Sequence, residues 1–126
     1  DEFRRQRAAL AEVYNAGLVD LPLTLPAGAT NTFDHAWHLY VVRLHKDARL
    51  TRDQLFDALL ERGIVCSVHY TPLHRFTYWR ERYKLSGNAF PNAEAAFASA
   101  ITLPLFPGMK EDEIGYVIDA LHQLLR

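Results

Sequence analysis

Residues 36–70 contain the patterns of a strand, a helix and a second strand in close succession, and this restricts the fold more than any other part of the chain. Apolar side chains alternate along 36–44, as in a strand with one buried face. Thr51 begins a helix pattern, with Gln54 placed as in a capping box, and Gly63 ends it. Residues 64–70 are again largely apolar. Two strands joined through a helix favour a right-handed crossover with the strands parallel.

A third, shorter strand is predicted at 101–105, between flanking prolines. If it lies between the other two and runs antiparallel to them, the sheet has the split arrangement of ferredoxin-like folds. We therefore predict an α+β fold. A small antiparallel or mixed three-stranded sheet (about 38–44, 64–70 and 101–105) would pack against helices.

Four further segments have helical spacing of apolar residues, namely 3–17, 77–83, 91–100 and 110–125. Gly17 is the expected end of the first helix. The last helix has the most regular apolar stripe, formed by Ile114, Val117, Ile118, Leu121, Leu124 and Leu125. Residues 20–34 hold prolines, glycine and threonines and are predicted to be an extended connector.

Composition favours a single domain and gives little support to nucleic acids or membranes as partners. The 126 residues suit one domain, and 14 basic against 15 acidic residues give a net charge of -1. This balance provides no reason to expect a nucleic acid or an acidic membrane as a partner. The sequence contains one cysteine, Cys66, and lacks the apolar core of a signal peptide near its start, which favours a reducing, cytoplasmic location. Because it opens on Asp1 rather than methionine, we expect a piece of a longer protein.

The segment after the second predicted strand gathers the most titratable groups. His69, Tyr70, His74 and Arg75 surround Pro72 there. Loops supported by a rigid strand are where binding residues concentrate, so these four are the candidate ligand-binding residues. The competing interpretation is local: the histidine and tyrosine satisfy the sheet edge, and the arginine is solvated.

Metal binding and nucleophilic catalysis are less favoured. Six histidines and Cys66 are present, but Cys66 and His69 face opposite sides of an extended strand, and zinc needs three or four converging ligands. Cys66 lies among valines, where a thiol usually behaves as an inert apolar group. Residues 75–84 alternate basic and aromatic side chains, which favours a short packed helix, with nucleotide phosphate contact as the alternative. We expect no catalytic, cofactor-binding or metal-binding residue in this chain.

Several sequence blocks together resemble one known family. They are His-Ala-Trp-His-Leu-Tyr-Val-Val-Arg-Leu at 35–44, the helix pattern at 52–64, Val-His-Tyr-Thr-Pro-Leu-His at 68–74, the aromatic stretch at 78–83, Phe90-Pro91 with Glu94, and Thr-Leu-Pro-Leu-Phe-Pro-Gly-Met at 102–109. In this order they resemble the C-terminal small domain of the DegT/DnrJ/EryC1/StrS aminotransferases, fold-type-I enzymes that use pyridoxal phosphate, mostly on nucleotide-linked keto-sugars. The resemblance covers about residues 4–125.

The resemblance implies that most of the chemistry lies elsewhere in the parent protein. A large N-terminal domain would supply the Schiff-base lysine and the phosphate site, and Lys46, Lys84 and Lys110 do not match that lysine motif. The chain alone is expected to hold no cofactor and to be inactive. Residues 1–18 would be an interdomain helix, 19–35 a connector and 36–126 the α+β core.

The resemblance also implies the partners. The parent would be a homodimer that takes a nucleotide sugar and an amino donor. This chain would form one wall of the substrate cleft, where His69, Tyr70, His74 and Arg75 bind sugar or phosphate oxygens. Alternatives are a non-catalytic interaction module, or a parent from the sugar-dehydratase branch of the family, in which histidine replaces the lysine. Apolar surface on the first helix predicts self-association of the isolated chain.

Overall fold

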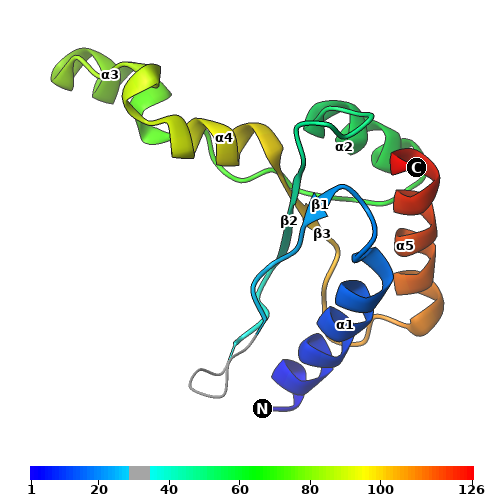
Figure 1. Ribbon diagram of the computed structural model, residues 1–126. Helices are drawn as coiled ribbons and strands as arrows, with labels where there is room; N and C mark the ends of the chain where they lie inside the picture. The colour runs from blue at the N-terminus through cyan, green and yellow to red at the C-terminus, as the bar shows by residue number, and fades with distance from the viewer. Residues whose placement is uncertain (29–34) are drawn as a thin grey trace.

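The computed structural model describes residues 1–28 and 35–126 and contains both helices and a small sheet (Figure 1). The helices are α1 (Glu2–Leu18), α2 (Arg52–Glu61), α3 (Thr77–Tyr83), α4 (Pro91–Ser99) and α5 (Glu111–Leu125), with short 3-10 turns η1 (Leu73–Arg75) and η2 (Gly87–Ala89). The strands are β1 (Leu23–Thr24), β2 (Tyr40–Leu44) and β3 (Ala100–Leu103). The predicted α+β class is confirmed. Within the described residues, no helix is long and apolar enough to cross a membrane.

The sheet has the order β1-β2-β3, and both pairs are antiparallel. Tyr40 lies opposite Leu103 in the register of β2 with β3. Beyond β3, Ser67 forms an antiparallel bridge with Thr102, with N–H to carbonyl distances of 3.2 and 2.9 Å. β3 therefore lies between β2 and the Ser67 segment and runs antiparallel to both, which is the predicted split order.

The predicted strand at 64–70 is wrong in extent. Ile64 and Cys66 are buried, but Val65 is 72% exposed and Tyr70 is 93% exposed. The chain pairs with β3 only at Ser67 and then leaves the sheet towards Pro72. An apolar run predicts extended backbone, but a ladder also needs a neighbouring strand along its whole length.

Residues assigned to the connector supply the sheet's third strand instead. β1 pairs with the end of β2, placing Leu23 opposite Leu44. Leu21 and Leu23, within the predicted connector, are buried. A two-residue strand is too short to show alternation, so its pairing is decided by the partner strand. The other two predicted strands are shorter than expected: β2 begins at Tyr40, with His38 exposed and outside it, and β3 ends before Pro104, which has no N–H to donate.

The core lies between one face of the sheet and helices α1, α2 and α5, with α1 and α5 side by side in Figure 1. Gly17 was predicted to end α1, but the helix continues to Leu18. A Cβ at Gly17 would lie 2.8 Å from Cδ1 of Ile118. This glycine therefore permits close approach of α1 to α5. At α2, the predicted capping box of Thr51 and Gln54 and the left-handed Gly63 after the helix are confirmed.

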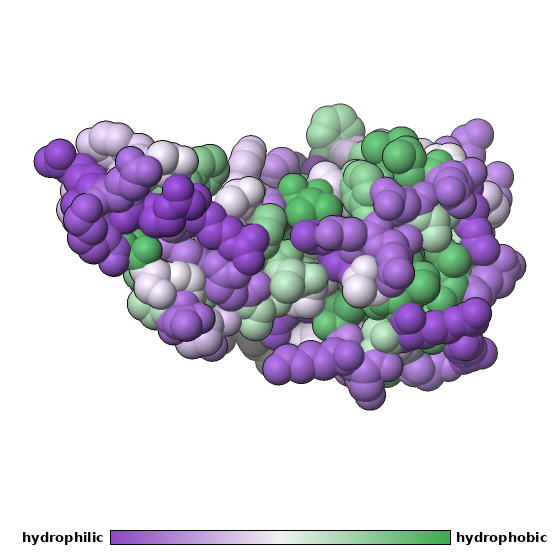
Figure 2. Space-filling model, turned by 90° about the horizontal axis from the view of Figure 1, so that it is seen from above, coloured by the Kyte–Doolittle hydropathy of each residue, from purple (hydrophilic) through white to green (hydrophobic). Residues whose placement is uncertain are grey.

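Residues 73–99 form an extension, called the arm, that projects from the rest of the molecule, called the body (Figure 1). The arm comprises η1, α3, η2 and α4, and its single buried residue is His74. In Figure 2 hydrophilic residues dominate the projecting end, while the more hydrophobic groups gather over the body. The predicted apolar face of α4 is only partly covered. The arm is therefore held by contacts other than a hydrophobic core.

Candidate functional site

A cluster of three polar side chains connects the two ends of the arm. His74 and Arg75 lie on η1, and Glu94 lies on the first turn of α4. His74 Nε2 is 2.5 Å from Glu94 Oε1, and the Arg75 Nε–H donates to the same oxygen at 2.9 Å. A terminal nitrogen of Arg75 also donates to Glu94 Oε2. One carboxylate thus fixes both predicted ligand-binding residues of η1.

Aromatic rings enclose this cluster. The His74 ring stacks on Phe90 with centroids 4.7 Å apart, and the Arg75 guanidinium lies 5.1 Å from the Phe97 ring centroid. Hydrogen bonds from Arg75, and then from His74, lower the pKa of Glu94 to about 2, so the carboxylate is ionised at neutral pH. The same hydrogen bond raises the pKa of Arg75. The cluster is a charged group with a fixed geometry.

The cluster borders a hollow of about 930 Å³, called the arm hollow, which is lined by His74, Arg75, Arg80, Gly87, Asn88, Pro91 and Glu94. Arg80 comes from α3, and its side chain has no hydrogen-bond or ion-pair partner among residues 1–28 and 35–126. The hollow thus presents one unpaired guanidinium, one paired guanidinium and the amide of Asn88. These groups can bind the oxygens of a polar or anionic ligand.

His69 and Tyr70 lie elsewhere. They border a smaller hollow of about 240 Å³ on another part of α4, with Pro72, Ala93, Ala96, Phe97 and Ala100. His69 Nε2 lies 3.1 Å from Thr102 Oγ1, which agrees with the competing view that this histidine serves the sheet edge. The tyrosine is 93% exposed and packs against little. The structure therefore divides the four predicted residues into two pairs, of which only His74 and Arg75 share a partner.

Sequence reasoning gave no binding role to two charged members of the arm hollow, Arg80 and Glu94. Glu94 was noted as part of the family pattern but given no role, because 20 residues separate it from His74 and no local spacing links them. Arg80 lies in the stretch 75–84, for which a short packed helix was the favoured interpretation. The alternation of basic and aromatic residues at 75–84 was the available signal for Arg80. Contact with a nucleotide phosphate was the alternative interpretation of that alternation.

Other candidates for chemistry have little support. Burial raises the pKa of the Cys66 thiol to about 11, which opposes a nucleophilic role. Within the described part of the chain, no three His, Cys, Asp or Glu side chains are grouped so as to hold a metal ion. Lys46, Lys84 and Lys110 are all exposed, whereas a Schiff-base lysine requires a desolvated pocket. The residues present therefore do not fit a complete pyridoxal phosphate site.

The chain is similar to curated and structurally solved sugar-related proteins. It is 30% identical over 128 residues to the spore coat polysaccharide biosynthesis protein SpsC of Bacillus subtilis (strain 168), covering 100% of this chain and 33% of that protein. A putative sugar aminotransferase, Spr1654 of Streptococcus pneumoniae, solved in its PMP-form, matches with a TM-score of 0.86 and 26% identity over 97% of this chain and 30% of that one.

A further solved structure is DesV of S. venezuelae in complex with a ketimine intermediate. It matches with a TM-score of 0.83 and 32% identity, over 96% of this chain and 31% of that chain. The chain thus spans about a third of the length of these relatives. The family model of the DegT/DnrJ/EryC1/StrS aminotransferases matches residues 1–122. This chain therefore belongs to the DegT/DnrJ/EryC1/StrS aminotransferase family, whose enzymes depend on pyridoxal phosphate.

Proposed function

We propose that this chain is the C-terminal small domain of an aminotransferase that acts on a nucleotide-linked keto-sugar, and that it forms one wall of the substrate cleft. The observation that carries the proposal is the His74–Glu94–Arg75 cluster beside the arm hollow, in a chain of this family. The names of the relatives, which include a sugar aminotransferase and a polysaccharide biosynthesis protein, support a sugar substrate.

In this proposal, the arm hollow contacts the polar part of the substrate. The Arg80 guanidinium has no protein partner among the described residues and is available to a phosphate or sugar oxygen. Arg75 and His74 are held by Glu94 and keep their orientation when substrate enters. His69 and Tyr70 would extend the wall along α4. A preset geometry reduces the entropy lost on binding.

The exposure of Lys46, Lys84 and Lys110 supports a parent protein in which another domain holds the cofactor. Because all are exposed, we propose that the Schiff-base lysine lies in a preceding large domain and that residues 1–18 connect the two. The isolated chain should then be inactive. Mixing it with pyridoxal phosphate and glutamate should give neither turnover nor the absorbance of a protein-bound aldimine, and a stoichiometric aldimine would contradict the proposal.

The substrate wall is tested in the full-length protein with Arg80→Gln. We expect KM for the sugar nucleotide to rise about tenfold, as for loss of one charge-assisted contact. The half-reaction with the amino donor alone should stay unchanged, because it does not use this wall. Arg82→Gln is the matched control, since Arg82 lies on the same helix and does not line the arm hollow. Equal effects of both substitutions would contradict the proposed contact.

A second candidate is a non-catalytic interaction module. It is favoured by aromatic side chains that stay exposed on the arm, Tyr78 at 62% and Tyr83 at 55%, and by Phe3 of α1 at 65%. Mixing the chain with the remainder of its parent separates the two. Restored transaminase activity supports the domain proposal, and binding without activity supports the module.

A further inference from the structure

A hollow of about 640 Å³ lies at the opposite end of α4, away from the arm hollow, and the two share no lining residue. It is bounded by the turn that follows β2, the start of α2 and the last residues of α4. Its lining includes Arg43, His45, Lys46 and Arg49, and we call it the basic hollow. All four of these side chains belong to exposed residues.

Three of these cations lack a counter-charge. The side chains of Arg43, Lys46 and Arg49 have no hydrogen-bond or ion-pair partner among residues 1–28 and 35–126. No acidic residue lines the hollow within the same ranges. The whole chain has a net charge of -1, so this cluster does not reflect a generally basic surface. Like charges gathered without partners repel one another, and a bound anion relieves that repulsion.

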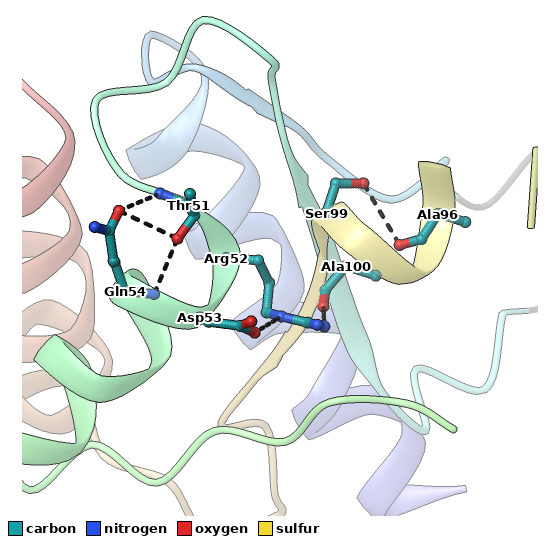
Figure 3. Close-up of polar contacts among 7 residues, drawn as sticks. All are labelled: Thr51, Arg52, Asp53, Gln54, Ala96, Ser99 and Ala100. Carbon is teal, nitrogen blue, oxygen red and sulfur yellow. Dashed lines mark hydrogen bonds and ion pairs between the residues drawn. The ribbon is translucent and has the colours of Figure 1, made fainter. Parts of the chain in front are cut away.

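Arg52 differs from these three cations, because its guanidinium group already has hydrogen-bond partners within the protein. It is 7% exposed, its Nε–H donates to Asp53 at 2.5 Å, and Nη1 donates to the Ala100 carbonyl at 3.1 Å (Figure 3). This arginine ties α2 to the junction of α4 and β3. It therefore builds the wall of the basic hollow and leaves the other three cations free for a ligand.

Two other features of the basic hollow restrict the kind of ligand that it can bind. The hollow lies at the first turn of α2, where the helix dipole adds positive potential, while Thr51 and Gln54 satisfy each other's backbone groups there (Figure 3). Its remaining lining is mostly apolar, with Leu44, Ala48, Leu50, Ala95 and Ala98 beside the hydroxyl-bearing Thr24 and Ser99. A cationic rim beside an apolar floor fits a ligand that carries both kinds of group.

We propose that the basic hollow binds a small molecule that carries two or more phosphate groups beside an apolar portion. Guanidinium groups match phosphate oxygens in a paired geometry, and three cations can neutralise more than one phosphate. A long nucleic acid fits less well, because its binders present an extended basic face, whereas Arg43, Lys46 and Arg49 are confined to one hollow. The inference does not depend on the proposed sugar-nucleotide wall.

The test is calorimetric titration of the 126-residue chain at low ionic strength with inorganic pyrophosphate, orthophosphate and phenyl phosphate. We expect one pyrophosphate per chain, bound about tenfold more tightly than orthophosphate, because two phosphates meet more of the cations. Phenyl phosphate should also bind more tightly than orthophosphate, because its ring contacts the apolar floor. Absent binding of pyrophosphate, or equal affinity for all three probes, would overturn the proposal.

Charge removal locates the site. The variant R43Q/K46Q/R49Q should weaken pyrophosphate binding by at least about tenfold, while R80Q/R82Q/K84Q, which removes three cations from the arm, should change it less than about twofold. Equal loss in both variants would indicate non-specific attraction, and loss in the arm variant alone would place the anion in the arm hollow. Both results contradict the proposal. If the triple variant does not fold, Lys46→Gln and Arg49→Gln are tested singly against Lys84→Gln.

Discussion

The buried hydrophobic residues of the described chain all lie in the body, whereas the arm has His74 as its single buried residue. The body is stabilised by apolar packing of α1, α2 and α5 on the sheet. The arm is ordered by one carboxylate that binds an imidazole and a guanidinium, and by stacked rings. Apolar packing resists pH and salt, while a partly exposed ionic cluster responds to both. The comparison teaches that one chain can combine a rigid support with an adjustable extension.

The largest expected effect comes from removing a core side chain of the body. Leu121 is fully buried, so Leu121→Ala should lower the free energy of unfolding by about 2–5 kcal/mol through lost burial and an unfilled cavity. Urea denaturation measures the change. Leu73→Ala, at an arm residue that is 66% exposed, is the control and should change stability by less than about 0.5 kcal/mol. Similar losses in both would remove the distinction between body and arm.

Glu94→Gln should loosen the arm without unfolding the body. The substitution keeps the size of the side chain but removes the charge that binds His74 and Arg75. Amide hydrogen exchange should become about tenfold faster in α3 and α4 and stay unchanged in α5, since local opening is governed by local contacts. Glu81→Gln is the matched control, because Glu81 is exposed on α3 and takes part in no ion pair among the described residues. Unchanged exchange in the Glu94 variant would contradict this account.

Two glycines test packing within the body. Gly115 lies inside α5, and a Cβ added there would have open space within 4 Å, so Gly115→Ala should stabilise the chain by about 0.5–1 kcal/mol through helix propensity. At Gly17 the same gain is offset, because the new methyl group would meet Ile118 at 2.8 Å. Thermal unfolding of both variants provides the measurement. An equal rise in Tm for both variants would show that the packing of α1 against α5 accommodates the added methyl group without loss of stability.

The smallest effect is expected from acid. The pKa of Glu94 falls from 4.5 to about 2 on folding, so its contribution to stability is fully present above pH 4.5 and is lost as pH falls towards 2. NMR signals of the arm aromatic residues should shift over this window, and the Glu94→Gln variant should lack the shift. A shift centred near pH 4.5 would mean that Arg75 and His74 do not hold this carboxylate.

Local features were predictable where a short stretch determines them. The stripe of α5, the capping box of α2 and the left-handed Gly63 were all readable from sequence, because each depends on near neighbours. Features that depend on a distant partner were not. The extent of the segment at 64–70, the pairing of β1 and the packing role of Gly17 each require knowledge of which element lies opposite.

The candidate site shows the same limit. His74 and Arg75 were singled out because titratable side chains crowd around a proline, a signal within one loop. Glu94 could not be paired with them, since its contact closes over 20 residues of intervening chain. The separation of His69 and Tyr70 into another hollow also depends on how the chain turns at Pro72. Their role in binding substrate remains a prediction.

The passage from α4 directly into β3 has a mechanical consequence. Ser99 is the last residue of the helix and Ala100 the first of the strand, with no loop between them, and Arg52 braces this joint through the Ala100 carbonyl. On the other side, residues 68–72 connect the arm without strand pairing. We therefore expect a displacement of the arm to reach β3 mainly through α4, because, within the described chain, residues 68–72 are tied to β3 only by the contact of His69 with Thr102.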